Sequence, residues 1–314
     1  MPGPRHVLSI RRIAAAVAAF VVVACAAAWI ASPNPTSLQS RVRAHLSGTA
    51  GRAVPLDRTA PILRQAVVTT EDERFYRHHG IDLVGVARAL PYDLAHLTLA
   101  QGASTITEQV GKLLYLGGND HTPWRKLEDA ALALKLEFNY PKQQILAAYL
   151  DSAYFGDRAV GIDAASERYF GVPPARLTRG QATLLAGLPQ APSAYDPYLH
   201  PAAARARQIE VLRSLVRNGL LTETEAAAAI SRPLAIRGGE ALPPVHGVAL
   251  APGPTFAWTE LALGAALVVV GALVLVASRL PRLRFRYGVA IAQGFAILIV
   301  LLGVATAIRS FRVA

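Results

Sequence analysis

The stretch TTEDERFYRHHGIDLVGVARAL, residues 69–90, places an acidic cluster immediately before a segment rich in aromatic and histidine side chains. Thr70 and the glutamate three residues later match a helix capping box, which predicts that a helix begins here. Glu71 and Asp72 would then lie in the first helical turn, where the helix dipole favours acidic side chains. This structural role accounts for the cluster by itself, whereas a catalytic role requires a carboxylate that faces a cleft.

A second helix start is predicted in QGASTITEQVGKLLYL, residues 101–116, where Thr105 and Glu108 form another capping box. Ser104 and Thr105 offer hydroxyl and backbone N–H donors, and Lys112 follows about two helical turns later. Such a set of donors at a helix start suits an anionic phosphate. The same residues also describe a well-capped amphipathic helix with a solvated lysine, and this stretch alone does not choose between the two interpretations.

The third stretch, residues 121–156, reads HTPWRKLEDAALALKLEFNYPKQQILAAYLDSAYFG. Thr122 followed by a proline predicts an N-cap and the first turn of a helix. Arg125 and Asp129 are four residues apart, so the simplest interpretation of the two is an ion pair along that helix. Apolar residues recur at helical spacing and predict its buried face, namely Leu127, Ala131, Leu134 and Phe138.

The composition separates this chain from several classes of protein. Of its residues 53% are hydrophobic and 17% are charged, which excludes a disordered tail and does not fit an ordinary soluble enzyme. The net charge is +11, but most of the basic excess flanks apolar runs at the two ends, so nucleic-acid binding is not expected. The single cysteine, Cys25, excludes an internal disulfide. The adjacent His78 and His79 do not share a helix face, and no third ligand is evident, so no metal site is predicted there.

Three apolar runs predict transmembrane helices. Residues 13–31 follow a basic N-terminus and are just long enough to cross a bilayer, which predicts a signal anchor. A cleaved signal peptide and a lipoprotein processing box ending at Cys25 are the alternatives. Residues 257–277 and 287–308 are the other two runs, and the four arginines between them place that loop in the cytoplasm. All three assignments put the residues between the first two runs outside the cell membrane.

Between the first two runs the sequence reads as helices separated by Gly/Pro-rich loops, which predicts one mainly α domain with a substantial core. No internal repeat of fixed period is evident. The predicted order is a basic cytoplasmic N-terminus (1–12), a transmembrane signal anchor (13–31), a linker or membrane-proximal segment (32–59), the helical domain (60–237), a Gly/Pro-rich linker (238–256), a transmembrane helix (257–277), a basic cytoplasmic loop (278–286), a transmembrane helix (287–308) and a C-terminal tail (309–314).

The order and spacing of these stretches resemble the peptidoglycan glycosyltransferases, glycosyltransferase family 51. These are the glycan-polymerising domains of class A penicillin-binding proteins and the monofunctional transglycosylases. The resemblance covers about residues 60–200. It rests on EDERFYRHHG (71–80) with Arg88, GASTITEQ (102–109) with Lys112, Arg125-Lys126, ILAAYLDSAYFG (145–156) and LTRGQATLLAGLPQAPSAYDP (177–197).

The resemblance implies a lysozyme-like glycosyltransferase domain with a small membrane-proximal jaw subdomain. The implied reaction polymerises lipid II, with inversion, into β-1,4-linked glycan and releases undecaprenyl diphosphate outside the membrane. Glu71 would be the general base. A second carboxylate, Asp129 or its neighbour Glu128, would assist the donor diphosphate directly or through a divalent cation, Mg²⁺ or Mn²⁺. The residues to which the resemblance assigns substrate binding are Asp72, Arg88, Ser104, Thr105, Gln109, Lys112, Arg125 and Lys126.

The implied partners are lipid II, the growing glycan strand, membrane lipid and membrane proteins of the cell-wall synthesis machinery. The sequence departs from the family pattern at Asp129, which replaces a glutamate, and at Leu113, which replaces an asparagine; Asp151 stands where asparagine is common. Neither the S-x-x-K nor the K-T-G motif of a transpeptidase is found, so a monofunctional enzyme is expected. The alternatives are a catalytically weak or inactive membrane scaffold with the same fold and a lysozyme-like glycan hydrolase.

Overall fold

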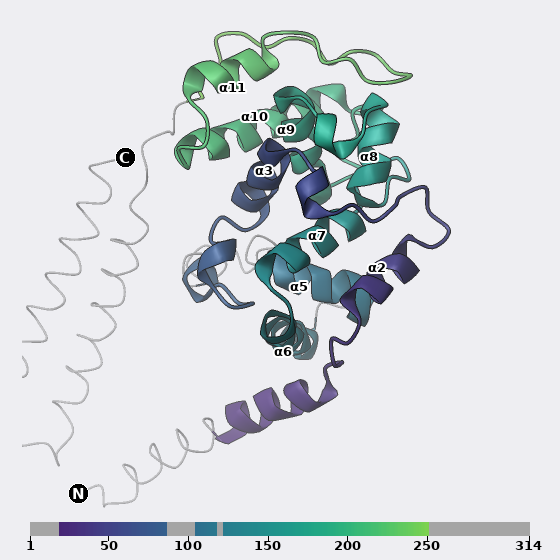
Figure 1. Cartoon of the computed structure of the whole chain (residues 1–314). Coiled ribbons are helices and arrows are strands. Elements are labelled where there is room, and N and C mark those ends of the chain that lie inside the picture. The colour runs from purple at the N-terminus through teal and green to yellow at the C-terminus, as the bar shows by residue number, and fades with distance from the viewer. Residues whose placement is uncertain (1–18, 87–103, 118–121, 251–314) are drawn as a thin grey trace, which may run out of the picture. The chain divides into compact units, whose positions relative to one another are not determined.

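The computed structural model describes residues 19–86, 104–117 and 122–250. These residues form a mainly helical fold (Figure 1), and extended segments among them pair only through isolated bridges. The longer helices are α2 (Leu38–Leu46), α3 (Pro61–Glu71), α5 (Ile106–Gly111), α6 (Pro123–Asn139), α7 (Lys142–Ser152), α8 (Gly161–Phe170), α9 (Arg179–Gly187), α10 (Pro201–Arg217) and α11 (Glu223–Ile230). The short helical turns are η1 (Leu56–Arg58), η2 (Phe75–Arg77), η4 (Lys112–Leu116), η5 (Pro174–Arg176) and η6 (Leu188–Gln190).

The chain divides into two compact units. The first unit, Met1–Asp82 with Ser104–Ala251, holds nearly all of the described residues and every helix named above. The second unit consists of Leu83–Ala103 and Pro252–Ala314, and only residues 83–86 of it are described. The core and the candidate site therefore belong to the first unit alone.

The core of the first unit has two neighbouring sets of packed helices. In one set α3 packs against α9 and α10, and in the other α5 packs against α6 and α7. Helix α2 also packs against α7 and buries three aliphatic side chains, although it lies in the segment predicted to be a linker. Burial of each large apolar side chain stabilises the fold by roughly 1.5–3 kcal/mol. The largest fully buried side chains are Tyr149, Tyr169, Phe75 and Phe155.

Two of the three predicted helix starts are confirmed. The Thr105 side chain accepts a hydrogen bond from the Glu108 backbone N–H in a complete capping box, and Thr122 caps α6 in front of Pro123. The third prediction is wrong, because Glu71 is the last residue of α3 rather than part of a first turn. The physical reason is the apolar run before it, which forms a helix from residue 61 onward and buries its inner face in the core.

The predicted buried face of α6 is only partly correct. Ala131 is buried, but Leu134 is 38% exposed and Phe138 is 93% exposed. The face turned to the core instead carries Leu132 and Leu136, which are both fully buried. Gly111 of α5 explains why this face of α6 is the buried one, since a Cβ at residue 111 would lie 3.1 Å from the Leu132 side chain. The glycine lets the two helices approach closely along the Leu132 face.

The prediction of three transmembrane helices is corrected by the structure. Among the described residues, no helix is both long enough and apolar enough to cross a membrane. Residues 19–31 of the first predicted span are helical, and its residues 13–18 lie outside the described residues. The predicted spans 257–277 and 287–308 and the arginine-rich loop between them lie outside the described residues.

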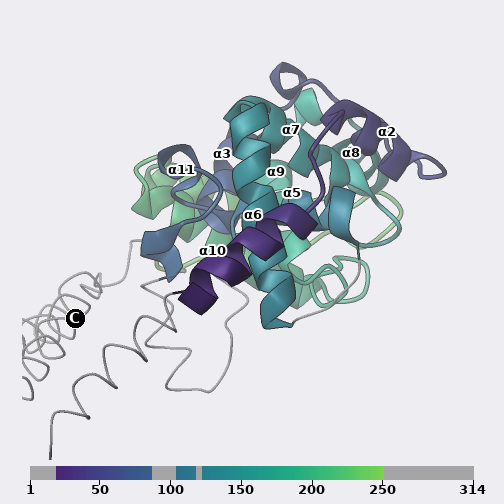
Figure 2. The same cartoon turned by 90° about the horizontal axis from the view of Figure 1, so that it is seen from below.

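The helical segment 19–31 ends at residue 31, and this end contacts α6. Lys135 of α6 donates hydrogen bonds of 2.7 Å to the carbonyl oxygens of Trp29 and Ser32. Its ammonium group also lies 5.1 Å from the centre of the Trp29 ring. Figure 2 shows this segment lying across α6. The lysine thus donates to carbonyl groups at the end of this helical segment.

Candidate active site

Glu71 stands at the C-terminal end of α3, half-buried and held by a side chain from another helix. Gln109 of α5 donates a hydrogen bond of 3.0 Å from its amide nitrogen to the Glu71 carboxylate. Burial raises the pKa of the Glu71 carboxyl above its ordinary value, while the Gln109 hydrogen bond and the positive charge of Arg207 offset part of that increase. A carboxylate with a raised pKa on a rigid helix end is suited to accept a proton.

The phenol of Tyr149 is a second neighbour that interacts with Glu71. Tyr149 lies on α7 and is 1% exposed. Burial, together with the negative charge of Glu71, raises the pKa of Tyr149 well above its ordinary value, so the phenol keeps its proton. The base candidate is therefore held by Gln109 of α5, and Tyr149 of α7 and Arg207 of α10 act on its charge.

Asp72 faces the interior, and it joins the loop after α3 to the start of α5. Both of its oxygens lie close to the His78 ring nitrogen, at 2.9 and 3.0 Å, and one accepts a hydrogen bond of 3.0 Å from the Ile106 backbone. Its side chain is 3% exposed. The geometry gives Asp72 the task of fixing the position of α5, and through α5 that of Gln109.

A basic cluster surrounds the second carboxylate, Asp129 of α6. Arg125 donates to Asp129 at 3.2 Å, which is the predicted i,i+4 pair, and both side chains are about seven-eighths buried, at 13% and 14% exposed. Burial raises the pKa of Asp129, and the charges of Arg125, Lys126 and Lys112 oppose this increase. Lys112 begins η4, a stretch of π-helix of the kind often found at functional sites.

The neighbouring Glu128 points elsewhere. It accepts a hydrogen bond of 2.9 Å from the indole nitrogen of Trp124, which is 42% exposed. Asp129 interacts with the positive charges of Lys112, Arg125 and Lys126. Glu128 is instead paired with the neutral indole of Trp124. Of the two candidate carboxylates, Asp129 therefore lies within the basic cluster and Glu128 pairs with Trp124.

The remaining predicted substrate-binding residues are Lys126, Ser104, Thr105 and Arg88. Lys126 reaches toward the start of α5, where it donates to the Ser104 hydroxyl at 3.0 Å and pairs with Glu108 at 3.1 Å. Thr105 is 2% exposed, and its hydroxyl donates to the Gly80 carbonyl at 2.6 Å, so it holds the fold together. Arg88 lies outside the described residues.

Sequence reasoning missed two residues of this site. Tyr149 lies inside the quoted stretch ILAAYLDSAYFG but carries no pattern that distinguishes it from a core tyrosine. Arg207 lies on α10, beyond all the quoted motifs, and nothing local marks it as a neighbour of Glu71. Only the packing of α3 against α10 brings the two together.

Comparison with known proteins adds to this geometry. The family model described as Transglycosylase matches residues 39–216, more than half of the chain. The chain belongs to the transglycosylase family. The match runs from the start of α2 to the end of α10, so this transglycosylase domain includes every residue of the candidate site.

Relatives of the domain are penicillin-binding proteins. Over 181 residues the chain is 41% identical to penicillin-binding protein 2D of Bacillus subtilis (strain 168), which covers 58% of this chain and 26% of the relative. It is 40% identical over 173 residues to penicillin-binding protein 1A of Neisseria lactamica, and this match covers 55% of this chain and 22% of the relative. The chain thus spans about a quarter of the length of these relatives, and the similarity is to a peptidoglycan glycosyltransferase domain.

The transglycosylase domain offers few protein ligands for a metal ion. Within residues 19–86, 104–117 and 122–250 there is no group of three or more His, Cys, Asp or Glu side chains that could hold one. Mg²⁺ is commonly held by one or two carboxylates together with substrate phosphate oxygens. Asp129, in its cluster of basic side chains, fits that pattern as the single protein carboxylate.

Proposed function

We propose that this transglycosylase domain polymerises lipid II into β-1,4-linked glycan strands, with inversion and release of undecaprenyl diphosphate. The proposal is supported by two features together: a half-buried carboxylate of raised pKa, Glu71, and a separate cluster of basic side chains around Asp129. The two groups lie on different helices, as an acceptor-activating base and a leaving-group site require.

In the proposed reaction the 4-hydroxyl of the acceptor sugar attacks the anomeric carbon of the donor. Glu71 takes the hydroxyl proton as the new C–O bond forms, because an un-ionised sugar hydroxyl is a poor nucleophile. A positioned base of this kind contributes roughly 10²–10⁴-fold to the rate. The bond to the diphosphate breaks at the same time, and the diphosphate leaves with the electron pair.

The leaving diphosphate gains negative charge, so the basic cluster stabilises the transition state more than the ground state. Lys112, Arg125 and Lys126 supply the positive charges, and Arg125 is held in place by Asp129. A bound Mg²⁺ or Mn²⁺ would add further positive charge at the phosphate oxygens. Asp129 is the residue that would hold it.

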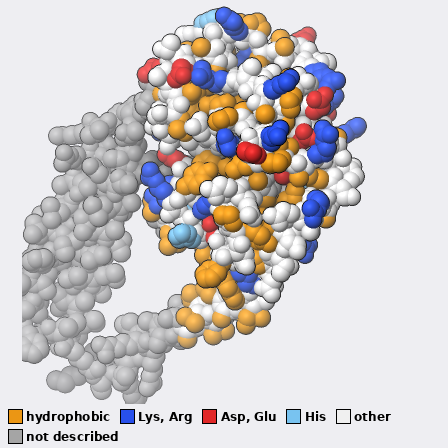
Figure 3. Space-filling model, viewed as in Figure 1, with side chains coloured by type: hydrophobic (Ala, Val, Ile, Leu, Met, Phe, Trp, Pro, Cys, Tyr) orange, Lys and Arg blue, Asp and Glu red, His pale blue; other side chains and the backbone are white. Residues whose placement is uncertain are grey.

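The place of action that fits this substrate is the extracytoplasmic face of the bacterial cell membrane, since the lipid tails of donor and acceptor stay in the bilayer. Figure 3 shows hydrophobic side chains gathered over the helical segment 19–31. Phe20 is 73% exposed and Ile30 is 82% exposed, and Phe138 of α6 adds another exposed apolar side chain. Apolar surface of this kind favours contact with lipid.

A polymerisation assay with purified lipid II tests the proposal. Wild-type protein is expected to produce glycan chains, and Glu71→Gln, which keeps the shape but cannot take a proton, is expected to produce none. If the wild type binds lipid II but makes no glycan under any condition, the scaffold alternative replaces the enzyme. If it shortens purified glycan and ignores lipid II, the protein is a hydrolase.

A further inference from the structure

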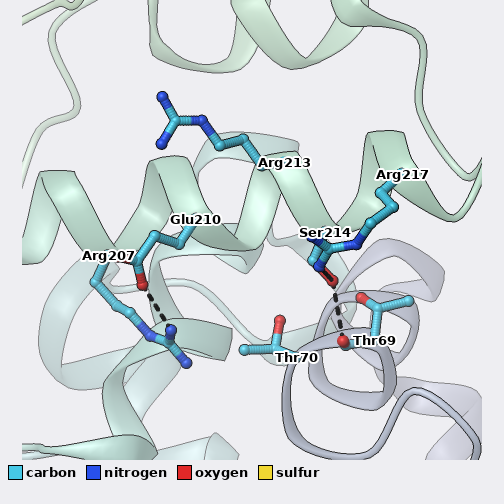
Figure 4. Close-up of a pocket in the computed structure, with 7 residues that line it drawn as sticks. All are labelled: Thr69, Thr70, Arg207, Glu210, Arg213, Ser214 and Arg217. Atoms are coloured by element: carbon cyan, nitrogen blue, oxygen red, sulfur yellow. Dashed lines mark hydrogen bonds and ion pairs between the residues drawn. The ribbon is translucent and has the colours of Figure 1, made fainter. Parts of the chain in front are cut away.

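A second basic cluster lies beside the end of α3, and it is carried by α10 rather than by α5 and α6. Three arginines of α10 and one glutamate line a pocket of about 240 Å³ together with the last turns of α3 (Figure 4). The pocket adjoins Thr70, the residue immediately before Glu71. None of the steps proposed above uses this pocket.

Arg207 forms one side of the pocket and is held in position before any ligand arrives. Its Nε donates to the Gly187 carbonyl at 3.2 Å, and one terminal nitrogen pairs with Glu210 at 2.8 Å. The Arg207 side chain is 10% exposed, whereas that of Glu210 is 58% exposed. A largely buried cation whose counter-ion is a solvated side chain can exchange that partner for a bound anion at small cost.

Arg217 forms the other side. It donates to the Ser214 hydroxyl at 3.3 Å, and Ser214 in turn donates to the Thr69 carbonyl at 3.0 Å, which ties α10 to the end of α3. The Thr70 hydroxyl oxygen is buried and makes no hydrogen bond within the described residues. In Figure 4 this hydroxyl lies between the side chains of Arg207 and Arg217. A buried hydroxyl without a partner costs free energy, and a ligand that accepts its proton would remove that cost.

We propose that this pocket binds an oxyanion, a carboxylate or a phosphate, between Arg207 and Arg217. The planar guanidinium group presents paired N–H donors that match the oxygens of either anion. The source of the oxyanion rests on the proposed function: a lipid-linked wall precursor carries both a diphosphate and peptide carboxylates. The binding site itself stands on the pocket geometry.

The position of the pocket links it to the reaction. Arg207 attracts the Glu71 carboxylate and thereby opposes the effect of burial on its pKa. An oxyanion bound to Arg207 would offset this attraction, so occupancy of the pocket would favour the protonated form of Glu71. The pocket is thus placed to bind substrate and to influence the base at the same time.

Titration of the full chain with two probes, inorganic phosphate and N-acetyl-D-alanine, tests the proposal by calorimetry. The informative variant is Arg217→Gln, which removes one of the two flanking guanidinium groups and leaves Arg207 and Glu71 in place. The matched control is Arg176→Gln, the same change of charge at an exposed arginine of η5 outside the pocket. Loss of a hydrogen-bonded charge is expected to weaken binding about tenfold. Thr70→Val serves as a second variant that changes no charge.

The proposal predicts saturable binding of at least one probe to the wild type, equal binding to Arg176→Gln, and weaker binding to Arg217→Gln and Thr70→Val. The preferred probe identifies the source of the anion. Absence of saturable binding of both probes overturns the proposal, as does an equal loss in Arg217→Gln and Arg176→Gln. The titration needs no glycosyl transfer, so its result is separate from that of the polymerisation assay.

Discussion

Asp151 is expected to make the stability of the domain depend on pH between about 4 and 7. Its carboxylate is 5% exposed and accepts a hydrogen bond of 3.0 Å from the Val54 backbone N–H. Burial is the main cause that raises the pKa of Asp151 to about 7, and the nearby Asp163 adds to it, while the Val54 hydrogen bond works in the opposite direction. In the unfolded chain the same carboxyl ionises near pH 3.9.

Between these two pKa values the folded domain binds a proton that the unfolded chain has already released. The free energy of unfolding therefore falls as the pH rises through this window. At about 1.4 kcal/mol per pH unit, the loss reaches at most about 4 kcal/mol at pH 8. Asp151→Asn keeps the oxygen that accepts from Val54 but cannot ionise, so its stability should stay level across the window.

The assay is thermal unfolding of wild type and Asp151→Asn at pH 4, 6 and 8, followed by circular dichroism. The midpoint of Asp151→Asn should rise relative to wild type by up to about 8–16 °C between pH 4 and pH 8, because 1 kcal/mol corresponds to roughly 2–4 °C for a domain of this size. Asp57→Asn, at an exposed aspartate of η1, is the matched control and should follow the wild type. Parallel curves for wild type and Asp151→Asn would refute the reasoning.

Three further predictions concern the active site and its supports. Because burial raises the pKa of Glu71, the polymerisation rate of the wild type should fall as the pH drops through that pKa, and a flat acidic limb in a pH–rate profile would contradict the role of base. Asp129→Asn should lower the turnover number by about 10²-fold or more, as removal of one transition-state contact does, while Glu128→Gln should change it little. If steady-state kinetics show the larger loss in Glu128→Gln, then Glu128 is the second carboxylate. Gly80 has φ +92°, and a Cβ there would lie 2.8 Å from the backbone of Ala133. Gly80→Ala should therefore lower the free energy of unfolding by about 1–3 kcal/mol, measured by denaturant unfolding. An unchanged unfolding midpoint would show that the contact can relax.

Local patterns predicted local structure well in this chain. The capping residues Thr105 and Thr122 mark the starts of α5 and α6, because a side-chain oxygen next to free backbone N–H groups acts within one turn. The same kind of pattern failed at Thr70, where the burial of the preceding apolar residues outweighs a capping signal. The apolar spacing in α6 likewise identified a helix but assigned Leu134 and Phe138 to the wrong side.

The amino-acid sequence by itself determined the helical class, two helix starts, the ion pair of Arg125 with Asp129 and membership of the family, since each depends on short spacings or on the order of motifs. Only the tertiary structure decided that Glu71 contacts Gln109 and that Asp72 pairs with His78. It also decided which arginine of α10, Arg207, acts on Glu71. The physical reason is that burial and charge at a site come from helices distant in sequence, and their contacts are set by how whole helices pack rather than by any neighbouring residue.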